Sequence, residues 1–325
     1  MLRRIGLLLN GDMPRSGVAG RDFAALVLAA VCWGTGTVIS KAALDEVPPL
    51  TLLPIQLGAS LVILGGLMRS QGIPFRSGGP PLLGRLGLLN PGLAYALSLI
   101  GLTAITASLS VLLWALEPLM IMALAGWFLH ERITPAFVVL SLVAVAGFAL
   151  IVFDPSAGSS QAIGIGLTVA GIACCAVYTV ITRRWIPEAQ ETSQVVVAQQ
   201  AHALALALVL VVIVGLAGGA IVPTALTPLG LASAVGSGAL YYAGAYWFYL
   251  GALRRVPASY ASVSFYLIPI VGGTAGAWLL GERLDARQWI GAVIVLGAVL
   301  AILRQPTAAA TNASPIPSPS DSTTA

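Results

Sequence analysis

Apolar residues along this chain are gathered into ten runs, which short polar, glycine-rich or proline-rich segments separate. Each run has about the 20 mostly apolar residues that an α-helix needs to cross the hydrocarbon core of a bilayer. The pattern therefore predicts an all-α integral membrane protein with about ten transmembrane helices. The predicted helices lie near residues 23–43, 49–68, 86–102, 105–128, 135–153, 163–182, 194–215, 228–250, 257–280 and 287–304.

The composition indicates that the surface of the protein faces lipid. Of 325 residues, 58% are hydrophobic and only 9% are charged, whereas a soluble domain has roughly 25% charged residues. The net charge is +4, but the arginines are scattered between apolar runs and form no basic face for nucleic acid. Cys32, Cys174 and Cys175 all lie inside apolar runs, so we expect no disulfide framework, no metal site and no cofactor.

Basic residues predict the orientation of the chain in the membrane. If the N-terminus is cytoplasmic and every predicted helix crosses the bilayer, only Lys41, Arg283 and Arg287 of the 16 Lys and Arg residues fall outside. Such an excess of positive charge marks the cytoplasmic side of membrane proteins. We therefore expect a protein of the cytoplasmic (inner) membrane with both termini in the cytoplasm.

The two ends of the chain lack the pattern of the predicted helices. Residues 1–22 are expected to be a cytoplasmic segment, because Gly11, Asp12 and Pro14 interrupt the apolar stretch that a signal peptide would need. Residues 305–325 are rich in Pro, Ser, Thr and Ala and have no apolar periodicity. This composition predicts a disordered cytoplasmic tail.

An internal repeat divides the predicted helical region. Residues 104–152 match residues 255–303 without gaps, at an offset of 151 positions. The matched pairs include Pro118 with Pro269, Trp127 with Trp278, Glu131-Arg132 with Glu282-Arg283, and Ala107-Ser108 with Ala258-Ser259. Residues 23–153 and 154–304 are therefore predicted to be two related repeats.

Each predicted repeat holds five helices, which is an odd number. The second repeat therefore enters the membrane from the opposite side, and the two five-helix repeats are inverted. Inverted repeats recur in secondary transporters, because a nearly symmetric pair can exchange inward-open and outward-open shapes around one site. A structural duplication or a channel is the alternative meaning of such a repeat.

Several of these residues resemble the EamA family of the drug/metabolite transporter superfamily. They are the Trp33-Gly34 pair and the twice-repeated Leu-x-Glu-Arg-Leu/Ile pattern at Leu129–Ile133 and Leu280–Leu284, which follows a proline-containing helix each time. The resemblance covers about residues 23–304, although Cys175-Ala176 replaces the Trp-Gly pair in the second repeat. It implies a ten-helix carrier of metabolites, with a central cavity lined largely by helices one, three, four, six, eight and nine. The family includes exporters of amino acids, aromatic ones among them, but the resemblance does not define a substrate.

Glu117 is the only acidic residue well inside an apolar segment. An ionised group there costs about 2.5–3.5 kcal/mol on insertion scales, so such residues usually face a cavity and bind protons or cationic groups. The adjacent Pro118 has no N–H and leaves the Trp114 carbonyl without its helical partner, which a protonated Glu117 could satisfy instead. However, Ile268 stands beside the equivalent Pro269, so a proline kink does not require a carboxylate. We predict that Glu117 contacts an amine-bearing substrate or exchanges a proton, and that both prolines kink their helices.

Helices four and nine present matching faces beside these prolines. Ser110 and Trp114 precede Glu117 by seven and three residues, so all three share one helical face. Ser262 and Tyr266 precede Pro269 by seven and three residues and form the matching face of helix nine. We expect both faces to line the substrate cavity.

Aromatic and hydroxyl side chains on other helices complete the predicted site. Tyr242 and Tyr246 are four residues apart in helix eight and would form a wall for flat or apolar substrates, although tyrosines also gather at membrane interfaces. Thr37 either faces the cavity or bonds to its own helix. The predicted substrate-binding residues are Trp33, Thr37, Tyr95, Ser110, Trp114, Glu117, Tyr178, Tyr242, Tyr246, Ser262 and Tyr266.

Three classes of function compete at this point. The sequence contains no GxxxxGK[ST] nucleotide-binding loop, so a transporter would depend on gradients or exchange. A membrane-embedded enzyme would need a cluster of His, Asp or Glu, and a channel would need a continuous polar lining. We predict a secondary transporter that exports amino acids, aromatic or hydrophobic ones among them, by alternating access; a multidrug or cation efflux carrier is the alternative. Its expected partners are a small-molecule substrate, coupled protons and the lipid bilayer, with no nucleic acid, in a monomer or homodimer.

Overall fold

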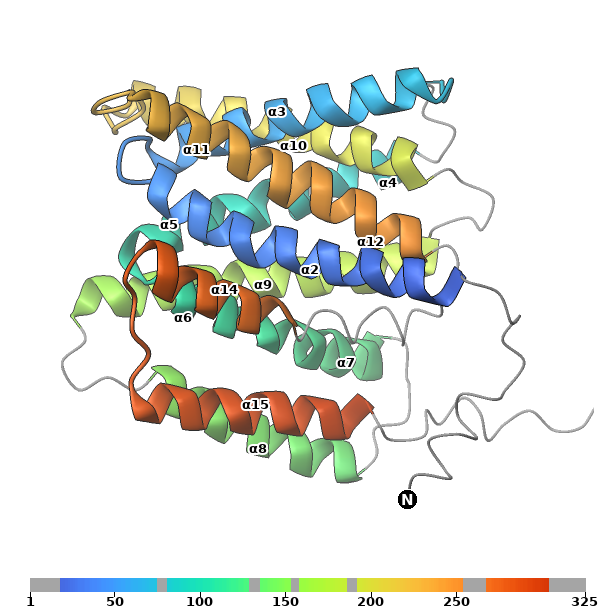
Figure 1. Cartoon of the computed structure of the whole chain (residues 1–325), viewed down its shortest axis with the longest axis vertical. Coiled ribbons are helices and arrows are strands. Elements are labelled where there is room, and N and C mark those ends of the chain that lie inside the picture. The colour runs from blue at the N-terminus through green and yellow to red at the C-terminus, as the bar shows by residue number, and fades with distance from the viewer. Residues whose placement is uncertain are drawn as a thin grey trace, which may run out of the picture.

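The computed structural model describes residues 18–74, 81–128, 135–152, 158–185, 192–253 and 267–303. Within these ranges every regular element is a helix, and the helices run side by side in one bundle (Figure 1). In the first repeat they are α2 (Val18–Ala43), α3 (Pro49–Ser70), α4 (Pro81–Arg85), α5 (Ala94–Ala104), α6 (Ala107–Leu113), α7 (Glu117–Phe128) and α8 (Pro135–Val152). In the second they are α9 (Ser159–Trp185), α10 (Thr192–Leu216), α11 (Pro228–Gly238), α12 (Ala245–Leu253), α14 (Leu267–Leu279) and α15 (Ala286–Leu303).

Several of the spanning segments contain a turn that is not α-helical. The 3₁₀ turn η1 (Leu86–Leu88) and the π-helix η2 (Leu89–Leu93) join α4 to α5. The 3₁₀ turn η3 (Trp114–Leu116) joins α6 to α7, and the π-helix η4 (Ala239–Gly244) joins α11 to α12. With these joints counted as continuous, the described helices form ten segments that correspond to the ten apolar runs, which confirms the predicted all-α architecture.

Apolar length and exposure agree with a membrane environment. Five helical segments are long and apolar enough to span a bilayer, namely Arg21–Ala43, Pro49–Ser70, Leu82–Ala104, Ser159–Thr182 and Ser193–Leu216. Large apolar side chains are exposed on the outside of the bundle, for example Val139, Leu142, Trp289 and Val293. Such a continuous apolar exterior is stable against lipid and not against water.

Equivalent helices of the two repeats pack against each other. α3 packs on α10, α6 on α14, and α8 on α15, so each of these pairs joins a helix to its own counterpart. Two further sets of contacts are also equivalent between the repeats. α5 packs on α9 as α11 and α12 pack on α2, and α6 and α7 pack on α9 as α14 packs on α2. This is the contact pattern of a pseudo-twofold arrangement, and the two halves therefore interlock.

Glycines allow the closest approaches between the halves. A Cβ atom at Gly34 would lie 2.8 Å from the backbone nitrogen of Gly272, so α2 and α14 almost touch there. A Cβ atom at Gly147 would lie 3.0 Å from the carbonyl oxygen of Gly291, where α8 meets α15. Small residues of this kind promote helix packing in membranes because backbones can approach closely. Gly34 of the Trp33-Gly34 pair therefore has a packing role.

The boundary between the third and fourth segments lies at Ile105 and Thr106, where the sequence carries no charge. Ile105 is extended, with φ −127° and ψ 165°, and ends α5. The Thr106 hydroxyl oxygen accepts a hydrogen bond from the backbone N–H of Leu109 at 3.1 Å. This side chain caps α6 and satisfies one of the free N–H groups of its first turn.

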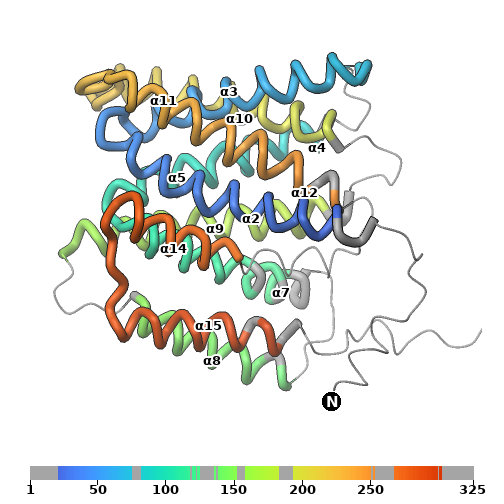
Figure 2. The backbone as a smooth tube through the Cα atoms, in the orientation of Figure 1, coloured from blue at the N-terminus to red at the C-terminus, as the bar shows by residue number. Residues whose placement is uncertain are grey.

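The turn from α2 to α3 and the connection from α14 to α15 lie at the same end of the bundle (Figure 2), and polar contacts join residues there. The Lys41 ammonium donates to the Leu102 carbonyl at 2.7 Å. The Glu46 carboxylate accepts hydrogen bonds from the backbone N–H of Thr227 at 2.8 Å and from its hydroxyl at 2.6 Å. This end is the outer one in the predicted orientation.

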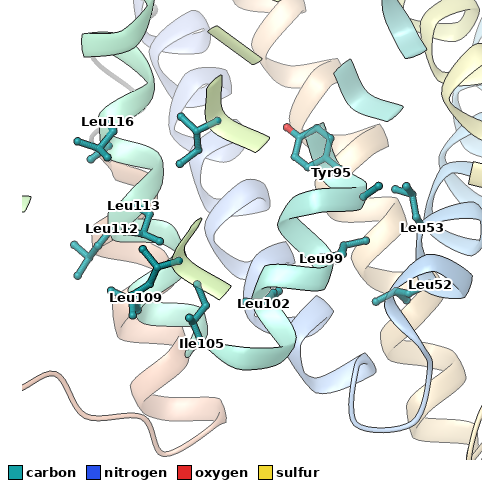
Figure 3. Close-up of a cluster of buried hydrophobic side chains, with 14 of the residues drawn as sticks. Leu52, Leu53, Tyr95, Leu99, Leu102, Ile105, Leu109, Leu112, Leu113 and Leu116 are labelled. Atoms are coloured by element: carbon teal, nitrogen blue, oxygen red, sulfur yellow. The ribbon is translucent and has the colours of Figure 1, made fainter. Parts of the chain in front are cut away.

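A leucine-rich core lies between α3, α5 and α6, and Figure 3 shows how these side chains meet. Leu52 and Leu53 are fully buried, and Leu99 and Leu113 are 5% and 0% exposed. Tyr95 belongs to the same cluster and lies on α5 together with Leu99 and Leu102. This core holds α5 and α6 in place beside the candidate site.

Candidate functional site

A small cavity lies inside the bundle, between α2, α3, α5, α6 and η4. Its volume is about 30 Å³, and one buried water needs about 10–15 Å³ by this measure, so it holds two or three water-sized groups. Its lining residues are Thr37, Ser40, Gln56, Tyr95, Ser98, Leu99, Leu102, Ser110, Trp114, Tyr241 and Tyr242. Both repeats contribute side chains to the lining.

Tyr95 is the centre of an aromatic wall in this cavity. It is stacked on Trp114, with ring centroids 5.6 Å apart and planes inclined by 20°. The rings of Tyr241 and Tyr242 meet it edge-on, each at 5.3 Å. Offset stacks and edge contacts are the favourable arrangements of aromatic pairs. The wall therefore joins two rings of the first repeat to two rings of the second.

The π-helical turn η4 places both Tyr241 and Tyr242 on the cavity. In a regular α-helix neighbouring residues point about 100° apart, and the i, i+4 spacing predicted Tyr242 together with Tyr246. A π-turn accommodates one extra residue and changes the register of the side chains. Tyr241, which regular periodicity did not predict, therefore lines the cavity, whereas Tyr246 does not.

A second irregular turn positions Trp114. The chain changes from α to 3₁₀ at Trp114–Leu116, immediately before Glu117 and Pro118. Pro118 has no N–H with which to continue the hydrogen-bond ladder, so a change of helix type is expected next to it. Pro269 lies in the first turn of the described part of α14, and a kink before it would fall outside the described residues.

Polar side chains complete the lining and connect three helices. The Gln56 amide nitrogen donates to the hydroxyl oxygens of Ser40 and Ser237, at 2.8 Å each. The Ser40 hydroxyl donates to the Gly36 carbonyl at 2.8 Å, and the Ser237 hydroxyl donates to the Ala234 carbonyl at 3.0 Å. The network therefore fixes the Gln56 side chain between α2, α3 and α11.

The structure brings together part of the predicted site. The predicted residues that line the cavity are Thr37, Tyr95, Ser110, Trp114 and Tyr242. Thr37 also donates to the Trp33 carbonyl of its own helix at 3.1 Å. Ser262 and Tyr266 lie outside the described residues. For every residue of the predicted set, contact with a substrate remains a prediction.

The other predicted residues lie beside the cavity and do not line it. Trp33 packs edge-on against Tyr246 at 5.8 Å, in a neighbouring aromatic cluster. The Tyr178 hydroxyl donates to the Gln199 side-chain oxygen at 2.8 Å and links α9 to α10. Glu117 begins α7, directly before Pro118, and is partly exposed. These residues support the walls of the site in the described conformation.

Six lining residues were absent from the predicted set: Ser40, Gln56, Ser98, Leu99, Leu102 and Tyr241. Gln56 is the one that the sequence signalled, because it is a polar residue within the apolar run at 49–68. Polar residues in spanning helices usually face the interior of the bundle. Which interior surface they face depends on how the helices pack.

Two interlocked, inverted helical repeats that close over a cavity lined from both halves are the architecture of a secondary transporter. The chain belongs to the EamA-like transporter family, whose model matches residues 23–153 and 162–304. It is therefore an integral membrane protein that transports a small molecule, and it is not an enzyme. The family membership does not define the substrate.

Two known proteins are similar to this chain. A protein of Archaeoglobus fulgidus described as an uncharacterized transporter is 23% identical over 286 residues, which cover 86% of this chain and 98% of that protein. A solved crystal structure of a protein matches with a TM-score of 0.59 at 17% identity, covering 86% of this chain and 95% of that one. At this identity the second match shows the shared fold alone.

Proposed function

We propose that this transporter exports amino acids or related metabolites, aromatic or hydrophobic ones among them, by alternating access. The observation that carries the substrate class is the aromatic wall of Tyr95, Trp114, Tyr241 and Tyr242 around the cavity. Aromatic faces and edges bind flat and apolar groups favourably. Because each repeat supplies two of the rings, movement of one half against the other changes the site itself.

The size of the cavity bears on the mechanism. About 30 Å³ is too small for an amino acid, so a substrate enters only when the halves move apart at one end of the bundle. The equivalent helix pairs α3–α10 and α6–α14 lie beside the cavity and give each half a similar surface on which to move. A nearly symmetric pair of this kind can open alternately toward the two sides.

Counterflow in proteoliposomes tests this proposal. Purified protein is reconstituted with unlabelled phenylalanine, tryptophan or leucine inside, and uptake of the labelled compound is measured, with glutamate and lysine as polar controls. We expect internal substrate to accelerate the uptake of phenylalanine or tryptophan. A channel would show no acceleration, and acceleration by polar compounds alone would contradict the proposed substrate class.

The membrane and the orientation are part of the proposal. We place the protein in the cytoplasmic membrane with both termini in the cytoplasm, as the excess of basic residues supports. Alkaline phosphatase fused after residue 220, between α10 and α11, would then be active, whereas a fusion at the C-terminus would be inactive. The reverse pattern would contradict the orientation, and with it the assignment of export.

Proton or cation exchange is the second candidate function, and Glu117 is the observation that favours it. This carboxylate lies in a spanning segment, directly before Pro118 at the start of α7, and its side chain is partly exposed. Carboxylates at such positions commonly bind protons or cationic groups. We propose that Glu117 exchanges a proton, or meets the amine of a substrate, when the cavity opens.

A further inference from the structure

Two polar atoms of cavity-lining residues have no hydrogen-bond partner among the described residues. They are the side-chain oxygen of Gln56 and the hydroxyl oxygen of Ser98. Gln56 is 1% exposed and Ser98 is 7% exposed. Buried polar groups are almost always paired, so an unpaired one requires an explanation. Gln56 lines the cavity, which indicates that its oxygen pairs with a ligand there, whereas the Ser98 oxygen packs against Gly171 of α9, which is outside the lining.

The hydrogen-bond network determines what kind of group this ligand presents. Both N–H groups of the Gln56 amide are used by Ser40 and Ser237, and the hydroxyl hydrogens of these serines are used by helix carbonyls. The serines can therefore only accept from Gln56, and the amide nitrogen must face them. The remaining atom, Gln56 Oε1, is an acceptor fixed in place, and its partner must be a hydrogen-bond donor.

Building on the proposed function, we infer that Gln56 binds the amine of the transported substrate, while its apolar part lies against Tyr95 and Trp114. The Gln56 oxygen accepts an N–H group of the amine. A carboxylate or carbonyl in the same place would meet an acceptor, so these groups face elsewhere. The substrate class is thus an aromatic or apolar compound that carries a primary amine.

A neutral acceptor also suits a carrier. Hydrogen bonds from an ammonium to a carboxylate are stronger than those to an amide oxygen, and a carrier must release its substrate on the other side. A site built to pair with N–H groups rejects an analogue without them, because its own buried acceptor is then left unpaired. Gln56 is therefore expected to determine specificity for the amine.

Matched compounds and matched variants test this inference with the purified full-length protein. Thermal stabilisation is measured with phenylalanine and tryptophan, and with 3-phenylpropanoate and indole-3-propanoate, which lack only the amine. Wild-type protein should bind each amine at least ~10-fold more tightly than its partner. In Gln56→Met, affinity for the amines should fall about 10-fold, affinity for the analogues should not change, and the discrimination should disappear.

Gln200→Met is the control. Gln200 is also 1% exposed, but its nitrogen donates to the Tyr242 carbonyl and its oxygen accepts from Ser60, so it has both partners. This variant should unfold at a lower temperature and keep the ratio of amine to analogue affinity. If Gln56→Met does not fold, the wild-type comparison of each amine with its analogue still decides the inference, because equal binding of the two would contradict it.

The outcomes separate the inference from the proposed function. The inference is wrong if wild type does not distinguish the amines from their analogues, or if Gln56→Met keeps the wild-type ratio of amine to analogue affinity. In that case the site binds water only. Counterflow of the same compounds would still support the transporter proposal. If neither amines nor analogues bind and no counterflow occurs, the substrate class is wrong and the inference fails with it.

Discussion

The carboxylate of Glu282, beyond the end of α14, accepts two hydrogen bonds from Ser108 at the start of α6, from the backbone N–H at 2.8 Å and from the hydroxyl at 2.7 Å. It also accepts the backbone N–H of Ala107 at 2.7 Å. A carboxylate at this position satisfies free N–H groups and meets the positive end of the α6 dipole. Gly276 leaves room for the contact, because a Cβ atom there would lie 2.6 Å from the Ser108 hydroxyl. The second repeat thus holds the first at one end of the bundle.

Glu282→Gln should destabilise this contact between the repeats. The amide retains one acceptor but turns an NH₂ group toward backbone N–H donors, so at least one charge-assisted hydrogen bond is lost. We expect the free energy of unfolding to fall by about 1.5–3 kcal/mol, measured by thermal or denaturant unfolding. Ser108→Ala, which removes only the hydroxyl, should cost about 1 kcal/mol. Equal stability of Glu282→Gln and wild type would show that the contact contributes nothing.

Gly34→Ala should weaken the packing of α2 on α14. The new Cβ would lie 2.8 Å from the Gly272 nitrogen and 3.0 Å from the Ile268 carbonyl oxygen, so backbone must move. Overpacking of this kind costs about 1–3 kcal/mol. Gly66→Ala is the control, because no atom lies within 4 Å of its added Cβ, and alanine favours the helix. Its unfolding temperature should match or exceed that of wild type, whereas a loss equal to that of Gly34→Ala would contradict the packing role.

Trp114→Ala should reduce the transport of aromatic substrates. The substitution removes the ring stacked on Tyr95 and with it much of the apolar surface of the cavity. We expect a loss of about 10-fold in counterflow of tryptophan, as 0.5–1.5 kcal/mol of ring contact is lost together with apolar burial. Trp289→Ala, which removes a ring that is 55% exposed on α15, should transport at the wild-type rate. Equal losses in both variants would argue against a substrate contact at Trp114.

Glu117→Gln separates proton coupling from substrate binding. If Glu117 exchanges a proton, the variant should lose uptake driven by a pH gradient, because glutamine does not titrate, while counterflow between equal pH values should remain. The measurement is initial transport rate over a range of pH values, with and without a gradient. A variant that matches wild type at every pH would remove the proton role, and loss of counterflow alone would favour an amine contact.

Asp285 should make the stability of α15 depend on pH. Its carboxylate accepts the backbone N–H of Gln288 at 2.7 Å, and this hydrogen bond, with help from Arg287, lowers the pKa of Asp285 below its ordinary value of 3.8. Because the folded state lowers the pKa, the stabilisation is present above pH 3.8 and is lost as the pH falls through the lowered pKa.

The matching experiment compares Asp285→Ala and Asp285→Asn with wild type. Asparagine caps a helix about as well as aspartate but does not titrate. The difference in unfolding temperature between wild type and Asp285→Ala should shrink as the pH is lowered from about 6 to about 2. The difference between Asp285→Asn and Asp285→Ala should stay constant. A constant difference for wild type as well would refute the effect of Asp285 ionisation.

The sequence alone determined the membrane class, the ten spanning segments and the repeat. Lipid leaves no alternative to long apolar helices, because every backbone group must be hydrogen-bonded within its own segment. This requirement applies to each segment separately, so each spanning helix can be predicted from its own stretch of sequence. The internal repeat could be recognised from the matching residues Pro118 and Pro269, because the effect of a proline is likewise local to its own helix.

Only the tertiary structure decided which side chains meet in the cavity. The π-turn η4 brings Tyr241 beside Tyr242, and regular helical spacing had favoured Tyr246 instead. The role of Gln56 depends on Ser40 and Ser237, which come from two other helices and from both repeats. Contacts between distant segments, and small changes of helical register, have no local signature in the chain. For this reason the aromatic wall was partly predicted, whereas the unpaired acceptor of Gln56 was not.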